Sequence, residues 1–285
     1  MSVIIAKNVL LMELDTALAS LNGGAVILHS DILRIGFIDK LKSREEICAD
    51  YLQVLTEVFA GRPLLIPSFN YDYCRSGKYD RRNSPSQVGA LTDYCRARYW
   101  HLRTLTPVFN FVVFNGDDFP MGPTANPFAE ESSFGQLLRR NGLILFLGAR
   151  LEANTFLHYV EECHQVGYRY LKKFPGEIID GDSRQQFLLE FRVRPLIENS
   201  AEYDWPRLTA DLSREGLLLE FKVGNGTLLA HRSGDLYQFW SLRLQQDEFY
   251  FLTENSRRVA ARLYREHGRP LTVECEEQWC SRLNK

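Results

Sequence analysis

Two apolar runs that flank one amphipathic stretch constrain the fold of this chain most. The runs cover residues 25–29 and 64–66, each bounded by glycine, proline or serine. Between them, apolar residues at helical spacing predict a helix over 44–60 that ends at Gly61. A strand, a helix and a second strand in this order indicate a βαβ unit with a parallel strand pair.

The remaining pattern extends this unit on both sides. Apolar and alternating runs predict strands, and capped or amphipathic stretches predict helices. The predicted strands cover 107–114, 143–147, 187–193, 217–223 and 228–230, and the predicted helices cover 84–97, 155–164 and 256–266. The fold class is therefore α/β, as a three-layer α/β/α arrangement with a central mixed sheet and extra strands in the C-terminal part. We expect one domain over 1–285, with a body over 1–175 and a C-terminal part over 176–285; a separate second domain is not required.

The composition excludes several classes of protein. Lys and Arg number 34 against 36 Asp and Glu, so bulk charge does not indicate a nucleic-acid partner. No window approaches about 20 uncharged apolar residues, so we expect no membrane span. No clear signal peptide precedes six scattered cysteines, which favours a cytoplasmic protein with free thiols. The pair Cys275 and Cys280 lacks a second ligand pair, and we expect no metal.

A polar stretch over 70–83 is too long for a simple connection and is rich in tyrosine and charge. Tyrosine rings beside carboxylates are typical of sugar-contacting surfaces, since a ring offers an apolar face and a hydroxyl. Asp72, Tyr73 and Asp80 are therefore candidate substrate-binding residues. The alternative is a lid that packs on itself.

Common nucleotide, hydrolase and zinc-protease signatures are absent, and the remaining polar motifs follow the predicted strands, where α/β sheets bind ligands. Their order along the chain is distinctive. They are His29-Ser30-Asp31-Ile32, Ser84-Pro-Ser86-x-x-Gly89, Arg103-Thr104-x-x-Pro107, Asn126-Pro-Phe128, Ser132-Ser-Phe134-x-x-Leu137, Leu145-Phe-Leu-Gly148 and Thr155-x-x-His158-x-x-Glu161. Over roughly residues 20–175 this series resembles the aminoglycoside 3-N-acetyltransferase family, also called the antibiotic N-acetyltransferase fold.

The resemblance implies an acyltransferase that uses acetyl-CoA or another acyl-CoA as co-substrate and a small-molecule amine as acceptor. Carried over to this chain, His158 becomes the general base and Glu161 its orienting partner. The resemblance also places the acyl-CoA contacts on Ser30, Asp31, Ser84, Ser86, Arg103, Thr104 and Thr155. It implies no nucleic-acid partner and leaves a homodimer open.

The chain departs from the family pattern around the expected donor pocket. Asp31 stands where members often carry serine, Thr104 and Thr106 fall in the usual Arg-Ser-x-His-Pro run, and Asn110 replaces a small serine. The departures favour an amino sugar, of surface glycan or nucleotide-sugar type, as acceptor. Two alternatives stay open: an aminoglycoside-resistance acetyltransferase, and a non-catalytic member that binds a glycan or a protein.

The residues themselves support the acyl-transfer reading. An amine must lose a proton to attack a thioester, and a histidine with a near-neutral pKa is the usual base. His158 and Glu161 lie three apart, so on a helix they share a face, and the carboxylate can fix the tautomer of the imidazole. The alternative is a helix-surface pair without a role. For Arg103, a phosphate contact and a surface ion pair remain equal alternatives.

Overall fold

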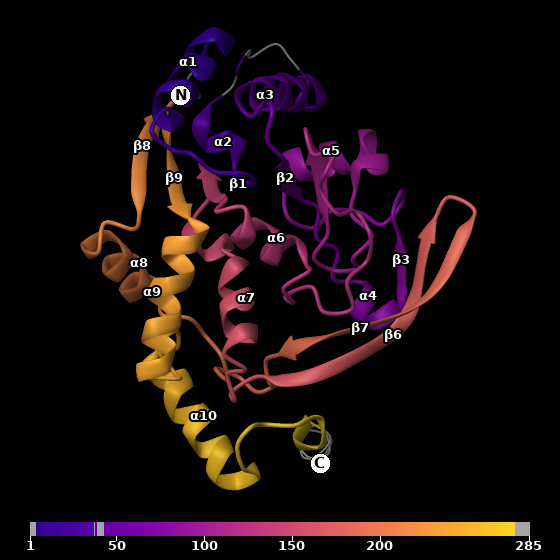
Figure 1. Cartoon of the computed structure of the whole chain (residues 1–285), viewed down its shortest axis with the longest axis vertical. Coiled ribbons are helices and arrows are strands. Elements are labelled where there is room, and N and C mark those ends of the chain that lie inside the picture. The colour runs from indigo at the N-terminus through magenta and orange to yellow at the C-terminus, as the bar shows by residue number, and fades with distance from the viewer. Residues whose placement is uncertain (1–3, 37, 39–42, 277–285) are drawn as a thin grey trace.

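A six-stranded mixed sheet lies at the centre of the computed structural model, which describes residues 4–36, 38 and 43–276 (Figure 1). The strand order is β4-β2-β1-β5-β9-β8. β1 runs parallel to β2 and β5, whereas β4 and β9 run antiparallel to their neighbours β2 and β5. The predicted parallel pair is confirmed, because Val26 of β1 is in register with Leu64 of β2. The strands are β1 (Val26–Ser30), β2 (Leu64–Pro67), β4 (Phe111–Phe114), β5 (Leu143–Leu147), β8 (Leu219–Val223) and β9 (Gly226–Arg232).

Helices cover both faces of this sheet, because successive side chains of a strand point to opposite faces. Leu28 of β1 belongs to the core cluster that contains Leu55 of helix α3. Its neighbour Ile27 belongs to the other cluster, with Leu157 and Trp240 from helices α7 and α9. The predicted three-layer arrangement is therefore confirmed. One face carries α1 (Lys7–Leu18), α3 (Arg44–Val58) and α5 (Ala90–Arg98), and the other carries α6 (Ser133–Arg139), α7 (Phe156–Cys163) and α9 (Ser233–Gln246).

A second, three-stranded sheet projects from the body as a long hairpin (Figure 1). Strands β6 (Tyr170–Asp180) and β7 (Ser183–Val193) pair along their whole length, and β3 (Lys78–Asp80) adds to β6 in parallel. The polar stretch over 70–83 is thus not a loop throughout, since it forms α4 (Tyr73–Ser76) and β3. The two segments touch closely at Gly176, where a Cβ would lie 2.2 Å from the carbonyl oxygen of Gly77.

The C-terminal part packs against the same body. The predicted strands over 187–193 and 228–230 fall within β7 and β9, the one predicted over 217–223 corresponds to β8, which begins two residues later, and the predicted terminal helix is α10 (Glu254–His267). A short helix α2 (Ile32–Ile35) follows β1, and α8 (Trp205–Arg214) follows the hairpin. Within the described part of the chain, no helix combines the length and apolar character needed to cross a membrane. The five described cysteines are free thiols, and Cys280 lies outside the described residues.

Two predicted elements are shorter than expected. The strand predicted over 107–114 begins only at Phe111, because Val108 has a φ of 66° and so breaks the extended run. The helix predicted from 84 begins at Ala90, with Gly89 at its cap position. Neither predicted serine caps it. Ser84 Oγ instead accepts from the Asp80 N–H, and Ser86 Oγ pairs with Thr92 Oγ1.

Candidate active site

Helix α7 brings the two predicted catalytic side chains together beyond the carboxyl end of β5. His158 and Glu161 lie three residues apart on this helix, which follows the turn after β5. Nδ1 of His158 lies 2.9 Å from Oε2 of Glu161. A carboxylate can only accept, so Nδ1 carries the proton and Nε2 keeps its lone pair. Local helical spacing thus produces a base with a defined tautomer.

The carboxylate of Glu161 is the centre of a buried polar cluster. The residue is 1% exposed, and it accepts hydrogen bonds from the hydroxyls of Tyr168 at 2.7 Å and Tyr203 at 2.8 Å. Arg169 Nε lies 2.8 Å from Oε2. Burial alone would raise the pKa of Glu161, but the Arg169 charge and the hydrogen bond from His158 outweigh it and hold this pKa at about 2. The carboxylate is therefore ionised at neutral pH.

His158 is held neutral. Burial lowers its pKa below the ordinary value of 6.5, and the positive charge of Arg169 acts in the same direction. The hydrogen bond to Glu161 opposes both effects without cancelling them. An unprotonated imidazole is the form that can accept a proton.

Two cavities adjoin at this imidazole, and a third continues from one of them. The first, which we call the strand-end cavity, has a volume of about 250 Å³. The second, the aromatic cavity, has a volume of about 540 Å³. Four residues line both of them: Tyr71, His158, Tyr203 and Trp205. The outer cavity, of about 390 Å³, shares Ser30, Val88 and Ala149 with the strand-end cavity. His158 therefore stands where two separate compartments adjoin, and one of them leads outward along the strand ends.

The comparisons with known proteins assign this arrangement to a family. The model of the family described as aminoglycoside 3-N-acetyltransferase matches residues 27–245. The chain belongs to the aminoglycoside 3-N-acetyltransferase family. It is accordingly a CoA-dependent N-acetyltransferase, the enzyme class expected from its motifs. The match extends well past residue 175, so the C-terminal strands belong to the family's pattern as well.

Solved structures show the same fold. The apoenzyme of aminoglycoside acetyltransferase AAC(3)-IVa is 20% identical, with a TM-score of 0.67, covering 92% of this chain and 98% of its own. AAC-IIIb in a binary structure with CoASH is 19% identical, with a TM-score of 0.69 and coverage of 88% and 99%. The YokD protein from Bacillus subtilis is 16% identical, with a TM-score of 0.65 and coverage of 87% and 96%. No curated protein matches the chain.

Several residues predicted from the family resemblance line these cavities. Ser30 lines both the strand-end and the outer cavity, and Thr155 lines the strand-end cavity beside His158. Asp31 lines the outer cavity, where it forms an ion pair with Arg34 at 3.1 Å. Another residue, Arg150, brings a second guanidinium to the same cavity. Two cationic side chains, Arg34 and Arg150, thus line the outer cavity.

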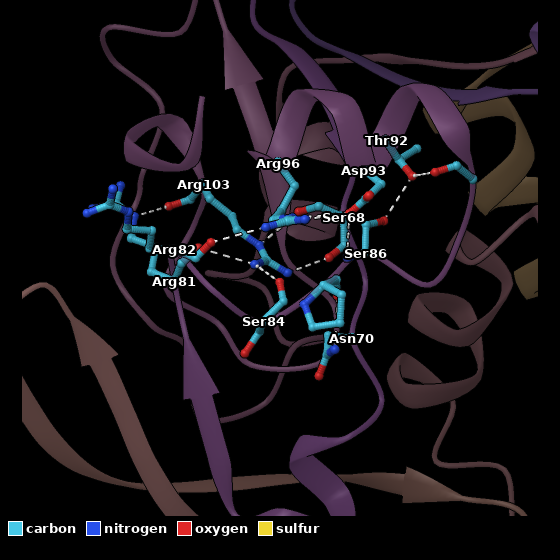
Figure 2. Close-up of polar contacts among 12 residues, drawn as sticks. Ser68, Asn70, Arg81, Arg82, Ser84, Ser86, Thr92, Asp93, Arg96 and Arg103 are labelled. Atoms are coloured by element: carbon cyan, nitrogen blue, oxygen red, sulfur yellow. Dashed lines mark hydrogen bonds and ion pairs between the residues drawn. The ribbon is translucent and has the colours of Figure 1, made fainter. Parts of the chain in front are cut away.

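Arg103 is placed differently from the prediction. It is 0% exposed, and its guanidinium donates to Ser68, Arg81 and Ser84 (Figure 2). It also donates to Oδ1 of Asn110. All three side-chain nitrogens are engaged in this way, and the group lines none of the cavities described above. Arg103 therefore makes neither the predicted phosphate contact nor a surface ion pair. Its hydrogen bonds instead hold the loop after β3 against the end of β2.

The predicted acyl-CoA contacts next to Arg103 also form hydrogen bonds within the protein. Thr104 is buried, and its Oγ1 accepts from the Phe111 N–H at 3.0 Å. Ser84 contributes its carbonyl oxygen to Arg103 and its hydroxyl to the turn (Figure 2). Ser86 reaches the strand-end cavity only indirectly, through its hydrogen bond to Thr92, which lines that cavity. None of Thr104, Ser84 and Ser86 lines a cavity described here.

The three predicted acceptor contacts also serve the local structure. Tyr73 is buried, and its hydroxyl donates to the carbonyl of Phe187. Asp80 accepts the N–H groups of Arg82 and Asn83 and so closes the turn after β3. Asp72 forms an exposed ion pair with Arg75 at 2.7 Å. From the polar stretch it is Tyr71, not these three, that lines the cavities.

Three residues that complete the site were not predicted from the sequence, and two of them come from the C-terminal part. Tyr203 and Trp205 form the shared wall of the two cavities, and Arg169 pairs with Glu161. Tyr203 is 45 residues from His158 along the chain, so no local spacing relates them. Asn154 carried a usable signal, since it directly precedes the Thr155 motif and lines the strand-end cavity.

Proposed function

We propose that the protein transfers an acetyl or other short acyl group from acyl-CoA to an amine, with His158 as general base and Glu161 as its positioning residue. One observation supports this most: a neutral imidazole, with Nδ1 committed to a buried carboxylate, stands where two cavities adjoin. A two-substrate reaction needs such a junction, since both reactants must be held together at the base.

The groups at the site account for every proton moved and every bond made or broken in the acyl transfer. Nε2 of His158 accepts a proton from the attacking nitrogen, and that nitrogen forms a bond to the thioester carbon. The C–S bond then breaks and the CoA thiolate leaves, taking up the proton from the imidazolium. While His158 is charged, Glu161 stabilises it from the opposite ring nitrogen, at 2.9 Å. Because Glu161 is already paired with Arg169, it remains ionised throughout.

We propose the strand-end and outer cavities as the acyl-CoA side. Ser30 and Thr155 line the inner part beside the base, and Asp31 with Arg34 and Arg150 lines the outer part. The aromatic cavity is then the acceptor side. Its rings can stack on the apolar face of a sugar. They are contributed by Tyr71, Phe109, Phe128, Phe191, Tyr203 and Trp205.

The charge of the acceptor side bears on the choice between an amino sugar and an aminoglycoside. Two solved relatives are AAC(3)-IVa variants in complex with a gentamicin and with apramycin, which favours the aminoglycoside alternative. A polycation is attracted by an acidic cavity. The aromatic cavity here is lined by Arg169, Arg192 and Arg194, and each of these guanidiniums pairs with one carboxylate, of Glu161, Glu162 and Glu202 respectively. Because this balance leaves no acidic excess to attract a polycation, we propose an amino sugar, with the nucleotide-linked type as the first candidate.

Release of free thiol tests the reaction and the acceptor together. The enzyme is incubated with acetyl-CoA and matched amines: a nucleotide-linked amino sugar, the corresponding free amino sugar, and gentamicin. We expect the highest kcat/KM for the anionic acceptor and the lowest for the polycation. Preferred turnover of gentamicin would establish the resistance-type activity instead. If acetyl-CoA neither raises the melting temperature nor is consumed with any amine, the chain is not a CoA-dependent enzyme.

A further inference from the structure

Asn154 lines the strand-end cavity, and both polar atoms of its side chain lack a hydrogen-bond partner within the described chain. The residue is 3% exposed, and the two atoms are Nδ2 and Oδ1. Nε2 of His29, which lines the same cavity, is buried and lacks a partner within the described chain as well. Two residues that carry unsatisfied buried polar atoms thus line one small compartment.

Buried amides are rarely left in this state. An unpaired buried donor or acceptor destabilises the folded state, so native proteins pair almost all of them. Asn110 of this chain follows that rule, because its Oδ1 accepts from both Ser68 and Arg103. Asn154 differs from Asn110 in that it lines a cavity, so a ligand can supply the partner that the protein does not.

The walls of the cavity define the chemistry of that ligand. Phe69, Val88 and Ala149 provide apolar surface, and His158 stands at one side. None of the arginines or lysines of the described chain lines this cavity, unlike the outer cavity with Arg34 and Arg150. An uncharged group with a carbonyl fits these walls, and a phosphate does not. The thioester end of an acyl-CoA is such a group.

We propose that the Nδ2 group of Asn154 donates a hydrogen bond to the thioester carbonyl oxygen of the bound acyl-CoA. This inference rests on the proposed function, since it assigns a contact within the same reaction. When the amine nitrogen bonds to the carbonyl carbon, the electron pair of the C=O bond moves to this oxygen. This electron pair re-forms the C=O bond when the C–S bond breaks. A fixed donor at that oxygen stabilises the transition state more than the ground state.

Two CoA derivatives that differ at the carbonyl group test the hydrogen bond from Asn154 directly. Acetyl-CoA contains the carbonyl, whereas S-ethyl-CoA replaces it with a methylene and is otherwise closely matched. We expect Asn154→Ala to weaken binding of acetyl-CoA about 5- to 10-fold, the equivalent of one hydrogen bond, and to leave S-ethyl-CoA binding unchanged. The kcat for acetyl transfer should fall about 100-fold. Asn154→Asp places an acceptor where the amide donor stood. We expect it to lower the affinity for acetyl-CoA, relative to that for S-ethyl-CoA, more than Asn154→Ala does.

Asn110→Ala is the matched control, because it removes a buried amide that is fully paired and lines none of the cavities described above. We expect it to lower the melting temperature without changing the affinity ratio of acetyl-CoA to S-ethyl-CoA. An equal loss of affinity for both derivatives in Asn154→Ala would overturn the proposal and place Asn154 on the pantetheine arm instead. Unchanged affinity for both would also overturn it. If the wild-type protein binds neither derivative, the proposed function itself fails, which is a separate result.

Discussion

Two buried charged clusters lie near the strand ends, and they differ in whether their side chains reach a cavity. In one, the guanidinium of Arg103 is surrounded by backbone carbonyls and neutral side chains (Figure 2). In the other, the carboxylate of Glu161 is surrounded by Arg169, two tyrosines and His158. Both charges are almost completely buried. Only the second cluster includes residues that line the cavities described above: His158, Tyr203 and Arg169.

The comparison shows that burial and charge do not by themselves distinguish a catalytic group from a structural one. Arg103 uses all three nitrogens within the protein, so it has none to offer a ligand. His158 commits Nδ1 and keeps Nε2 for a substrate. Variants in the two clusters should therefore separate activity from stability.

His158→Ala should have the largest effect of all. It removes the proton acceptor, so kcat for acetyl transfer should fall about 10²- to 10⁴-fold. The Kd for acetyl-CoA, from calorimetric titration, should stay within about 2-fold because most of the proposed donor contacts lie on Ser30, Thr155 and the outer cavity rather than on the imidazole. Wild-type turnover in this variant would remove His158 from the mechanism.

Glu161→Gln should be the most destabilising single change. It leaves the Arg169 charge buried without its partner, which costs about 3–5 kcal/mol in the free energy of unfolding measured with urea. If the remaining folded enzyme keeps full activity, the carboxylate has only a structural role. A loss of kcat in excess of the unfolded fraction supports its role beside His158.

Arg103→Leu should affect stability and leave the chemistry unchanged. Several buried carbonyl and amide oxygens lose their donor, so we expect the free energy of unfolding to drop by about 2–4 kcal/mol. Measured where the variant is folded, the KM for acetyl-CoA should match that of the wild type. A rise of the KM for acetyl-CoA without a rise of the KM for the acceptor would indicate that Arg103 contacts a CoA phosphate, contrary to the structure.

The pH dependence of kcat sharpens the comparison further. A base acts only when unprotonated, and burial lowers the pKa of His158. With a weakly basic arylamine as acceptor, whose own ionisation stays out of range, the rate should therefore persist below pH 6.5 and fall only at lower pH. A midpoint at or above the ordinary histidine value would contradict the neutral imidazole at this site.

Tyr203→Phe should give the smallest effect. It removes one of the hydroxyl donors to Glu161, and the other donors remain. We expect a loss of about 1 kcal/mol in stability and a few-fold decrease in kcat. A larger loss of kcat than in Glu161→Gln would indicate that Tyr203 contacts substrate from the wall that the two cavities share.

The elements that local pattern determines were predictable from the sequence. The βαβ unit follows from apolar periodicity over 25–66, and His158 with Glu161 follows from helical spacing within a motif. The position of Arg103 did not follow, because a sequence does not say whether a guanidinium faces a cavity or carbonyl groups. β6 and the first half of β7 were missed, since Pro175, Gly176 and a polar run obscure their alternation. Tyr203 was missed because only the folded chain brings it to His158.

The position of bound CoA tests the central claim most directly. A crystal structure of the protein with CoA should place the sulfur atom in the strand-end cavity, within direct or one-water hydrogen-bond reach of Nε2 of His158, about 3 Å for a direct contact. The pantetheine arm should then pass Ser30 toward the outer cavity. A CoA molecule whose sulfur lies away from this cavity, for example against the loop that Arg103 holds, would contradict the account.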